Sequence, residues 1–203
     1  MWVTNIKSGN VIVIGVSSGK VIATIDTGKG AHNVTLSRDG KLAFVANVGA
    51  DTVSIIDART KRVLANVPAG KKAHDVSLSP DGTRALASNV GEGTITLIDI
   101  AKRKALYTMA TGKKAIMSVF SPDGRRAFVV NAGEATISVV DLDKRQVIKT
   151  LPGGTGSMAF IVSPDWLSLL KTSYGTESLV FPLNAGYLLR HANNSVSPPR
   201  HSP

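Results

Sequence analysis

Two histidines at equivalent positions of a sequence repeat are the side chains of this chain best suited to hold a ligand. The sequence G-K-G-A precedes His32, and G-K-K-A precedes His74, which lies 42 residues later. Imidazole ligates transition metals and haem iron. The next two positions at this spacing are Ile116 and Met158, so the histidine set is incomplete. Two interpretations stay open: a metal or haem site at His32 and His74, or rings that bond a neighbouring backbone.

A group of lysines precedes the same positions of the repeat: Lys29, Lys71, Lys72, Lys113 and Lys114. The whole chain has 24 lysines and arginines against 14 acidic residues, a formal net charge of +10. Basic surfaces attract anions. No nucleic-acid-binding motif and no set of stacking aromatic residues is evident. The lysines therefore favour an anionic ligand or a protein partner, with simple surface solubility as the alternative.

No catalytic constellation can be recognised in the sequence. There is no phosphate-binding loop, no His-Glu-x-x-His and no Gly-x-Ser-x-Gly motif. The chain has no cysteine, which excludes disulfides, thiolate metal ligands and cysteine nucleophiles. Asp39, Asp81 and Asp123 each precede a glycine, as turn residues that bond their own backbone do. We therefore predict no catalytic residues and a non-enzymatic protein.

The elements that position these residues repeat with the same period of 42. Asp39-Gly40 recurs as Asp81-Gly82 and Asp123-Gly124, and asparagines and glycines keep the same interval. Such a period indicates stacked supersecondary units, none of which buries its apolar face alone.

One repeat unit contains four short runs rich in β-branched residues, and turn residues separate these runs. The predicted strands are Asn33–Ser37, Leu42–Val48, Thr52–Asp57 and Arg62–Val67. Four antiparallel strands in each repeat describe one blade of a β-propeller. The predicted fold is therefore all-β, a propeller of four-stranded antiparallel blades with about four to five blades present. The first strand of each blade would line the central channel.

The sequences Phe44-Val45-Ala46-Asn47-Val48-Gly49 and Leu78-Ser79-Pro80-Asp81-Gly82 resemble the YVTN-type β-propeller family, and the resemblance covers residues 2 to 165. It implies a periplasmic, cell-surface or secreted protein, although the chain shows no signal peptide and no transmembrane segment. More distantly, the loops before the two histidines resemble the haem-binding propeller of cytochrome-type nitrite reductases. Propellers host many activities, so these resemblances are specific for fold rather than function.

The two ends of the chain depart from the regular repeat. Propeller repeats are expected over residues 1–183, with partial first and last blades, and residues 184–203 are expected to be a disordered tail. The first unit starts at a second strand, Trp2–Asn5, whereas the last unit has a first strand at Met158–Ser163. That last strand could pair with the N-terminal strands and close a small ring. Alternatively, the chain is part of a larger propeller, or a homo-oligomer completes it; we favour an incomplete propeller.

Two function hypotheses follow. The first is a binding scaffold without a cofactor, whose lysine-bearing loops at the channel mouth engage a protein partner or an anionic ligand. The second is a redox-related protein that binds a metal or haem, with His32 or His74 as the ligand and the lysines paired with the carboxylates of the cofactor.

Overall fold

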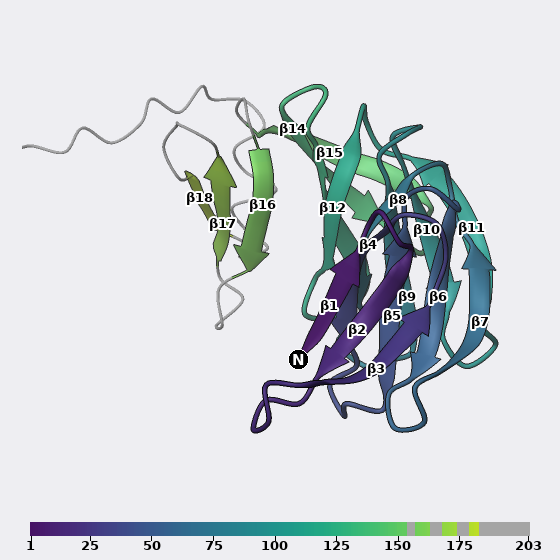
Figure 1. Ribbon diagram of the computed structural model, residues 1–203. Helices are drawn as coiled ribbons and strands as arrows, with labels where there is room; N and C mark the ends of the chain where they lie inside the picture. Colours follow the sequence, from purple (N-terminus) through teal and green to yellow (C-terminus); the bar gives the residue numbers. More distant parts are fainter. Residues whose placement is uncertain (154–156, 163–167, 174–178, 183–203) are drawn as a thin grey trace, which may run out of the picture.

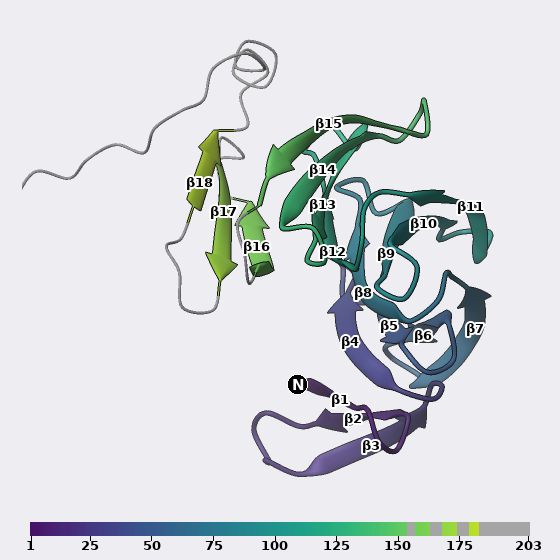
Figure 2. The ribbon, with the colours of Figure 1, turned by 90° about the horizontal axis from the view of Figure 1, so that it is seen from above.

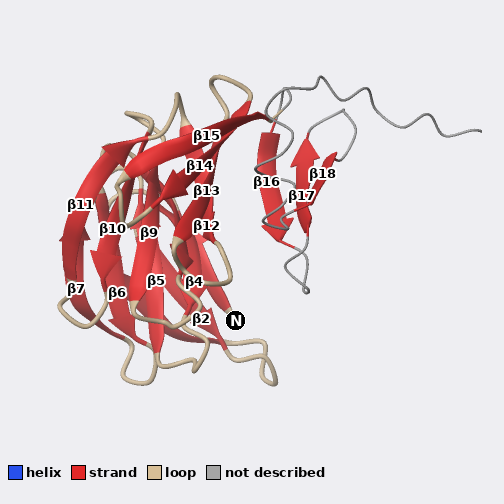
Figure 3. Ribbon diagram, turned by 180° about the vertical axis from the view of Figure 1, so that it is seen from behind, coloured by secondary structure: helices blue, strands red, loops and turns tan. Residues whose placement is uncertain are grey.

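The computed structural model describes residues 1–153, 157–162, 168–173 and 179–182, and all regular structure in these ranges is β-strand (Figure 1, Figure 3). The strands form five antiparallel sheets, three of four strands and two of three. The first two sheets are β1 (Trp2–Asn5), β2 (Asn10–Ile14) and β3 (Val21–Asp26), then β4 (Ala31–Leu36), β5 (Leu42–Asn47), β6 (Thr52–Asp57) and β7 (Arg62–Pro68). The third sheet contains β8 (Ala73–Leu78), β9 (Arg84–Asn89), β10 (Thr94–Asp99) and β11 (Lys104–Ala110). The last two are β12 (Ala115–Phe120), β13 (Arg126–Asn131), β14 (Thr136–Asp141) and β15 (Gln146–Pro152), then β16 (Ser157–Val162), β17 (Ser168–Ser173) and β18 (Leu179–Pro182).

The sheets are propeller blades that succeed one another around an open arc (Figure 2). Within each four-stranded blade the strands pair in chain order, so the strand that begins the blade lies at its inner edge. These inner strands, β4, β8 and β12, are neighbours, with β8 in contact with both of the others. The predicted all-β propeller of about four to five blades is therefore confirmed.

The two middle strands of each four-stranded blade carry the core. In β5, β9 and β13 every residue after the first is buried, whereas the outer strand β15 alternates between exposed and half-buried positions. Faces of adjacent blades pack together: Phe44 and Ile55 of one blade share a cluster with Val76 and Ile98 of the next. Each blade thus needs its neighbours to bury its apolar residues, which is the physical reason for the sequence repeat.

A layer of buried asparagines ends the second strand of each four-stranded blade. Asn47, Asn89 and Asn131 are fully buried, and their amide groups donate to two hydroxyls on the following strand. The side-chain oxygen of Asn131 accepts from Thr111 Oγ1 at 3.3 Å. The oxygen of Asn89 has no partner, because the residue equivalent to Thr111 is Ala69. This orphaned acceptor is a local defect in an otherwise satisfied layer.

Every inner strand contains a β-bulge at the same repeat position. The ladder between β4 and β5 passes from Ala31 to Asn33 and skips His32. The equivalent ladders skip His74, Ile116 and Met158. A bulge leaves one residue out of the ladder and bends the strand, so it re-aims the side chains around it. The histidines therefore stand at bulges, which a simple alternating strand pattern does not predict.

The alternative in which the last inner strand closes the ring with the N-terminal strands is wrong, and the favoured interpretation, an incomplete propeller, agrees with the open arc. Strand β16 pairs with β17 and packs against β12 and β13, while β1 pairs with β2. Pairing with β17 closes a short loop, whereas pairing with β1 would close one of more than a hundred residues at a larger entropic cost. Strands β17 and β18 follow β16 in a three-stranded sheet, which agrees with the predicted partial last blade. The expected tail, residues 184–203, lies outside the described residues.

Candidate functional site

Three loops that lead into β4, β8 and β12 carry the predicted ligand-binding lysines, and we refer to residues 28–30, 70–72 and 112–114 as the lysine loops. Because the three inner strands are neighbours and each begins directly after its lysine loop, these loops gather at one end of the channel. The side chains on them are all exposed: Lys29, Lys71, Lys72, Lys113 and Lys114. Among the described residues, the three ion pairs lie elsewhere and join Asp39, Asp99 and Asp141 to nearby lysines.

The backbone of each lysine loop is held by the blade it enters. The Lys29 carbonyl oxygen accepts from Gly49 N at 3.0 Å, and the equivalent bonds to the Lys71 and Lys113 carbonyls are 3.0 and 2.9 Å long. The residue after each of these lysines has a positive φ: 76° at Gly30, and 56° at both Lys72 and Lys114. At Gly30 a Cβ atom would lie 2.7 Å from Gly49 N, so a side chain there would require the local backbone to shift. The loops thus present flexible lysine side chains from a fixed backbone.

The two histidines bond the backbone of the next blade. His32 Nδ1 lies 2.9 Å from the His74 carbonyl oxygen, and His74 Nδ1 lies 2.9 Å from the Ile116 carbonyl oxygen. Thr4 Oγ1 donates to the His32 carbonyl oxygen at 2.8 Å and extends the series into the first blade. The backbone-bonding interpretation therefore describes these contacts, and the histidines tie neighbouring inner strands together at their bulges.

These bonds indicate which tautomer each imidazole adopts when it is neutral. A carbonyl oxygen only accepts, so each Nδ1 carries the proton and each neutral ring has its lone pair on Nε2. The ring centroids of His32 and His74 are 4.0 Å apart, with an angle of 37° between the planes. Burial, and then the charge of the neighbouring His32, lower the pKa of His74, against an opposing effect of the bond to Ile116. At neutral pH the lowered pKa favours the neutral form of His74, which is the form of imidazole that can ligate a metal.

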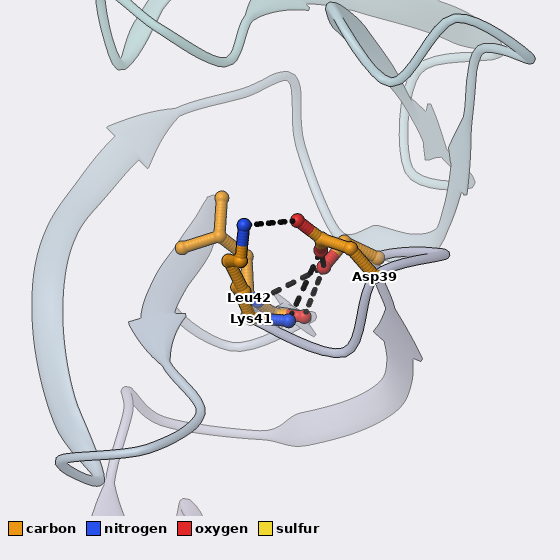
Figure 4. A network of polar contacts seen from close by, with 4 residues as sticks. Asp39, Lys41 and Leu42 are labelled. Carbon is orange, nitrogen blue, oxygen red and sulfur yellow. Dashed lines mark hydrogen bonds and ion pairs between the residues drawn. The ribbon is translucent and has the colours of Figure 1, made fainter.

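The repeated aspartates have the structural role predicted for them. Asp39 Oδ1 accepts from Ser37 Oγ at 2.7 Å and from Lys41 N at 3.1 Å in the turn between β4 and β5 (Figure 4). Asp81 makes the equivalent contacts in the next blade, and its bonds from Ser79 and the following backbone lower its pKa to about 2. These carboxylates are turn-forming groups at the end of the channel opposite to the lysine loops.

One buried acidic residue outside the turns, Asp75, was not predicted from the sequence to be a site residue. Asp75 lies on the inner strand β8, directly after the bulge at His74, and only 7% of its surface is exposed. Burial raises its pKa to about 6, although the backbone N–H groups of Ser118 and Val76 act to lower it. The available signal was a carboxylate inside an otherwise apolar and hydroxyl-bearing strand, A-H-D-V-S-L, rather than beside a glycine.

Neither a complete metal cluster nor a membrane-crossing helix occurs in the part of the chain that the structure describes. No three histidine, cysteine, aspartate or glutamate side chains in these ranges come together as metal ligands. The described residues also contain no helix of the length and apolar character needed to cross a bilayer. A metal at His32 and His74 would thus have at most two imidazole ligands from the described residues, whereas a haem iron needs only one.

Solved structures with the same fold include proteins of very different kinds. Hydrazine synthase of Kuenenia stuttgartiensis matches 91% of this chain with a TM-score of 0.80 and 18% identity. Dihydro-heme d1 dehydrogenase NirN, solved in complex with DHE, matches 91% of the chain with a TM-score of 0.72 and 20% identity. A protein of unknown function from Desulfotomaculum acetoxidans DSM 771 matches 90% with a TM-score of 0.78 and 17% identity. At these identities the likeness concerns the fold alone.

The chain spans only part of each of these neighbours, namely 60%, 41% and 62% of their lengths in the same order. No curated protein sequence matches it significantly. Residues 1–123, which include all three lysine loops and both His32 and His74, match the family of YNCE-like β-propellers. The predicted propeller-repeat resemblance is thereby confirmed, and this chain belongs to the YNCE-like β-propeller family.

Proposed function

We propose that this protein is a non-enzymatic binding scaffold whose lysine loops hold an anionic ligand or the acidic face of a protein partner. The observation that carries the proposal is the set of five exposed lysines on three equivalent loops, none of them in an ion pair with a described residue. By the family resemblance, its setting is outside the cytoplasm.

The geometry supports anion binding more than it supports surface solubility alone. Lys29, Lys71 and Lys113 occupy one position of the repeat on three adjacent blades, so their charges converge on the same end of the channel. Their backbones are already fixed by hydrogen bonds to Gly49, Gly91 and Gly133. Like charges gathered on a rigid frame raise the local potential and draw anions toward it.

The test compares two triple variants that remove the same charge. The variant Lys29→Gln, Lys71→Gln, Lys113→Gln removes the repeated charge of the lysine loops, and none of these residues has a positive φ. The control variant Arg59→Gln, Arg62→Gln, Lys104→Gln removes three exposed charges from the bends at the other end of the blades. Binding is measured to heparin, as a polyanion, and to polyglutamate, as an acidic polypeptide, across a series of salt concentrations.

We expect the lysine-loop variant to lose roughly 10-fold in affinity at low ionic strength, because each exposed charge contributes up to about 1 kcal/mol. The control variant should lose much less. Equal losses in the two variants would show that only net charge matters, and would refute a binding surface at the lysine loops. Preference for heparin or for polyglutamate then distinguishes an anionic glycan from an acidic protein partner.

A second candidate function, haem or metal binding, is favoured by the hydrogen bonds of the histidines. Ligating histidines usually donate their other ring N–H to a carbonyl or carboxylate, and His32 and His74 do so through Nδ1. Nε2 of His32 or His74 would hold the haem iron, and the nearby lysine loops would supply cations for the carboxylates of the haem. One of the fold neighbours, NirN, was solved with DHE bound.

Titration of the protein with haemin tests this candidate directly. If a histidine ligates the iron, a saturable absorption band appears and is lost or shifted in His32→Phe and His74→Phe variants. A band that both variants retain unchanged would rule out these histidines as ligands. The lysine-loop variant serves as the control for binding through the carboxylates alone.

A second copy of the chain is the proposed partner that completes the propeller. Within the described ladders, β1 pairs only with β2, although the equivalent strands β5, β9 and β13 each pair with an inner strand as well. An exposed strand edge is a template for pairing with another chain. Native mass spectrometry decides between a dimer and a 21.3 kDa monomer.

A further inference from the structure

A cavity opens at the end of the channel opposite to the lysine loops. Its volume is about 990 Å³, within the range of small-molecule sites. The inner strands β4, β8 and β12 contribute its wall, and the turns that follow them form its mouth. Polar side chains line it, with Asn33 and Thr35 on β4, and Asp75 and Ser77 on β8. We refer to it as the Asp75 cavity.

Asp75 is a buried carboxylate without a counter-ion. Only 7% of its surface is exposed, and no ion pair among the described residues includes it. The groups that influence its ionisation are its own burial and two backbone N–H groups, and no lysine or arginine is among them. An uncompensated charge in a low-dielectric site is costly, and a bound cation would relieve that cost.

Ser77 supplies a second unsatisfied group two residues along the same strand. Its Oγ atom is buried and has no hydrogen-bond partner, although the residue lines the cavity. Residues two apart on a strand lie on the same face, so Asp75 and Ser77 face the same space. A buried hydroxyl without a partner is uncommon and indicates a missing water or ligand group.

The mouth of the cavity carries charges of both signs. Asp39 and Asp81 lie there with Arg38, and Asp39 also pairs with Lys41. The preference for a positively charged occupant therefore comes from Asp75, which has no ion-pair partner among the described residues.

We propose that the Asp75 cavity binds a small molecule bearing a primary ammonium group, with the Asp75 carboxylate as its counter-ion and Ser77 Oγ as a hydrogen-bond acceptor. An ammonium carries three donors and no acceptor, which matches a site that offers unpaired acceptors. This site lies at the other end of the channel from the lysine loops. Either binding proposal can therefore be refuted without affecting the other.

Calorimetric titration with putrescine tests the proposal, with 1,4-butanediol and succinate as neutral and anionic probes of similar length. The variant Asp75→Asn keeps the shape of the side chain and removes its charge. Asp143→Asn removes an exposed carboxylate outside the cavity and is the matched control. Ser77→Ala removes the hydroxyl and provides a second test that leaves Asp75 in place.

We expect putrescine to bind the wild-type protein and the Asp143→Asn variant alike. Affinity should fall at least about 10-fold in Asp75→Asn, because an ionic hydrogen bond is lost, and about 5-fold in Ser77→Ala. Butanediol and succinate should bind much more weakly than putrescine. The proposal is overturned if putrescine does not bind at millimolar concentration, if Asp75→Asn binds it as well as wild type, or if butanediol binds equally well.

Discussion

Replacement of Asp75 by asparagine is expected to stabilise the folded protein at neutral pH. The folded-state pKa of Asp75 is raised from the ordinary value of 3.8 to about 6, because the carboxyl is buried on β8. Burial therefore disfavours the charged form, which the unfolded chain adopts freely. Asparagine at this position has no charge to bury, and its side-chain oxygen can accept from the same backbone N–H groups.

The sign and size of the effect follow from proton linkage. Below pH 3.8 the carboxyl of Asp75 is protonated in both states and costs nothing. As the pH rises through 3.8 toward 6, the unfolded state loses its proton first, so Asp75 destabilises the fold progressively and the full cost is present above pH 6. A difference of about two pH units between the two pKa values corresponds to roughly 3 kcal/mol. Between pH 4.0 and 7.5 the stability gained by the variant should therefore grow by about 2–3 kcal/mol.

Urea unfolding of the wild type and of Asp75→Asn at several pH values measures this difference. The turn aspartates, such as Asp81 with its lowered pKa, stabilise the fold as the pH rises, but they are present in both proteins and cancel in the comparison. The Asp143→Asn variant controls for the removal of one negative charge. A difference in unfolding free energy that stays constant from pH 4.0 to 7.5, or that shrinks, would refute the assignment of Asp75 as a buried, uncompensated carboxylate.

Two further predictions concern the asparagine layer and the turns. Ala69→Thr should raise the unfolding free energy by about 1 kcal/mol, because the new hydroxyl would reach the orphaned oxygen of Asn89. Thr111 makes the equivalent bond to Asn131 in the next blade. Urea unfolding that shows no gain in stability would contradict this prediction. Gly82→Ala should cost only about 1 kcal/mol, since φ is 71° but no atom lies within 4 Å of the added Cβ. Gly70→Ala should cost more, about 2–3 kcal/mol, because its Cβ would lie 2.6 Å from Asn89 Nδ2. Thermal unfolding of the two glycine variants side by side tests this order.

The sequence alone was sufficient to predict the blades and the roles of their turn residues. Strand boundaries agree within a few residues, as for the predicted Thr52–Asp57 and the observed β6. The role of Asp39 was predictable because a turn depends on residues close in sequence, whose side chains bond their own backbone. The common location of the lysine loops also followed from the repeat, because loops at equivalent positions of the 42-residue repeat lie at the same end of the channel.

The surroundings of the channel residues were not predictable in the same way. His32 and His74 lie in similar local sequences, G-K-G-A-H-N and G-K-K-A-H-D, but their partners belong to the following blade, 42 residues away. The bulges that hold them alter the alternation of side chains, so the sequence pattern did not indicate which residues line the cavity. Asp75 was overlooked for this reason.

The sequence by itself determined the 42-residue repeat, the four-stranded blades, the turn aspartates and the basic loops, because each depends on interactions within one repeat. Only the tertiary structure decided that the arc stays open, that the oxygen of Asn89 has no partner, and that Asp75 is buried beside an unpartnered hydroxyl. These features depend on which groups of neighbouring blades come into contact. Burial and charge compensation are properties of those contacts, and no single repeat contains both sides of them.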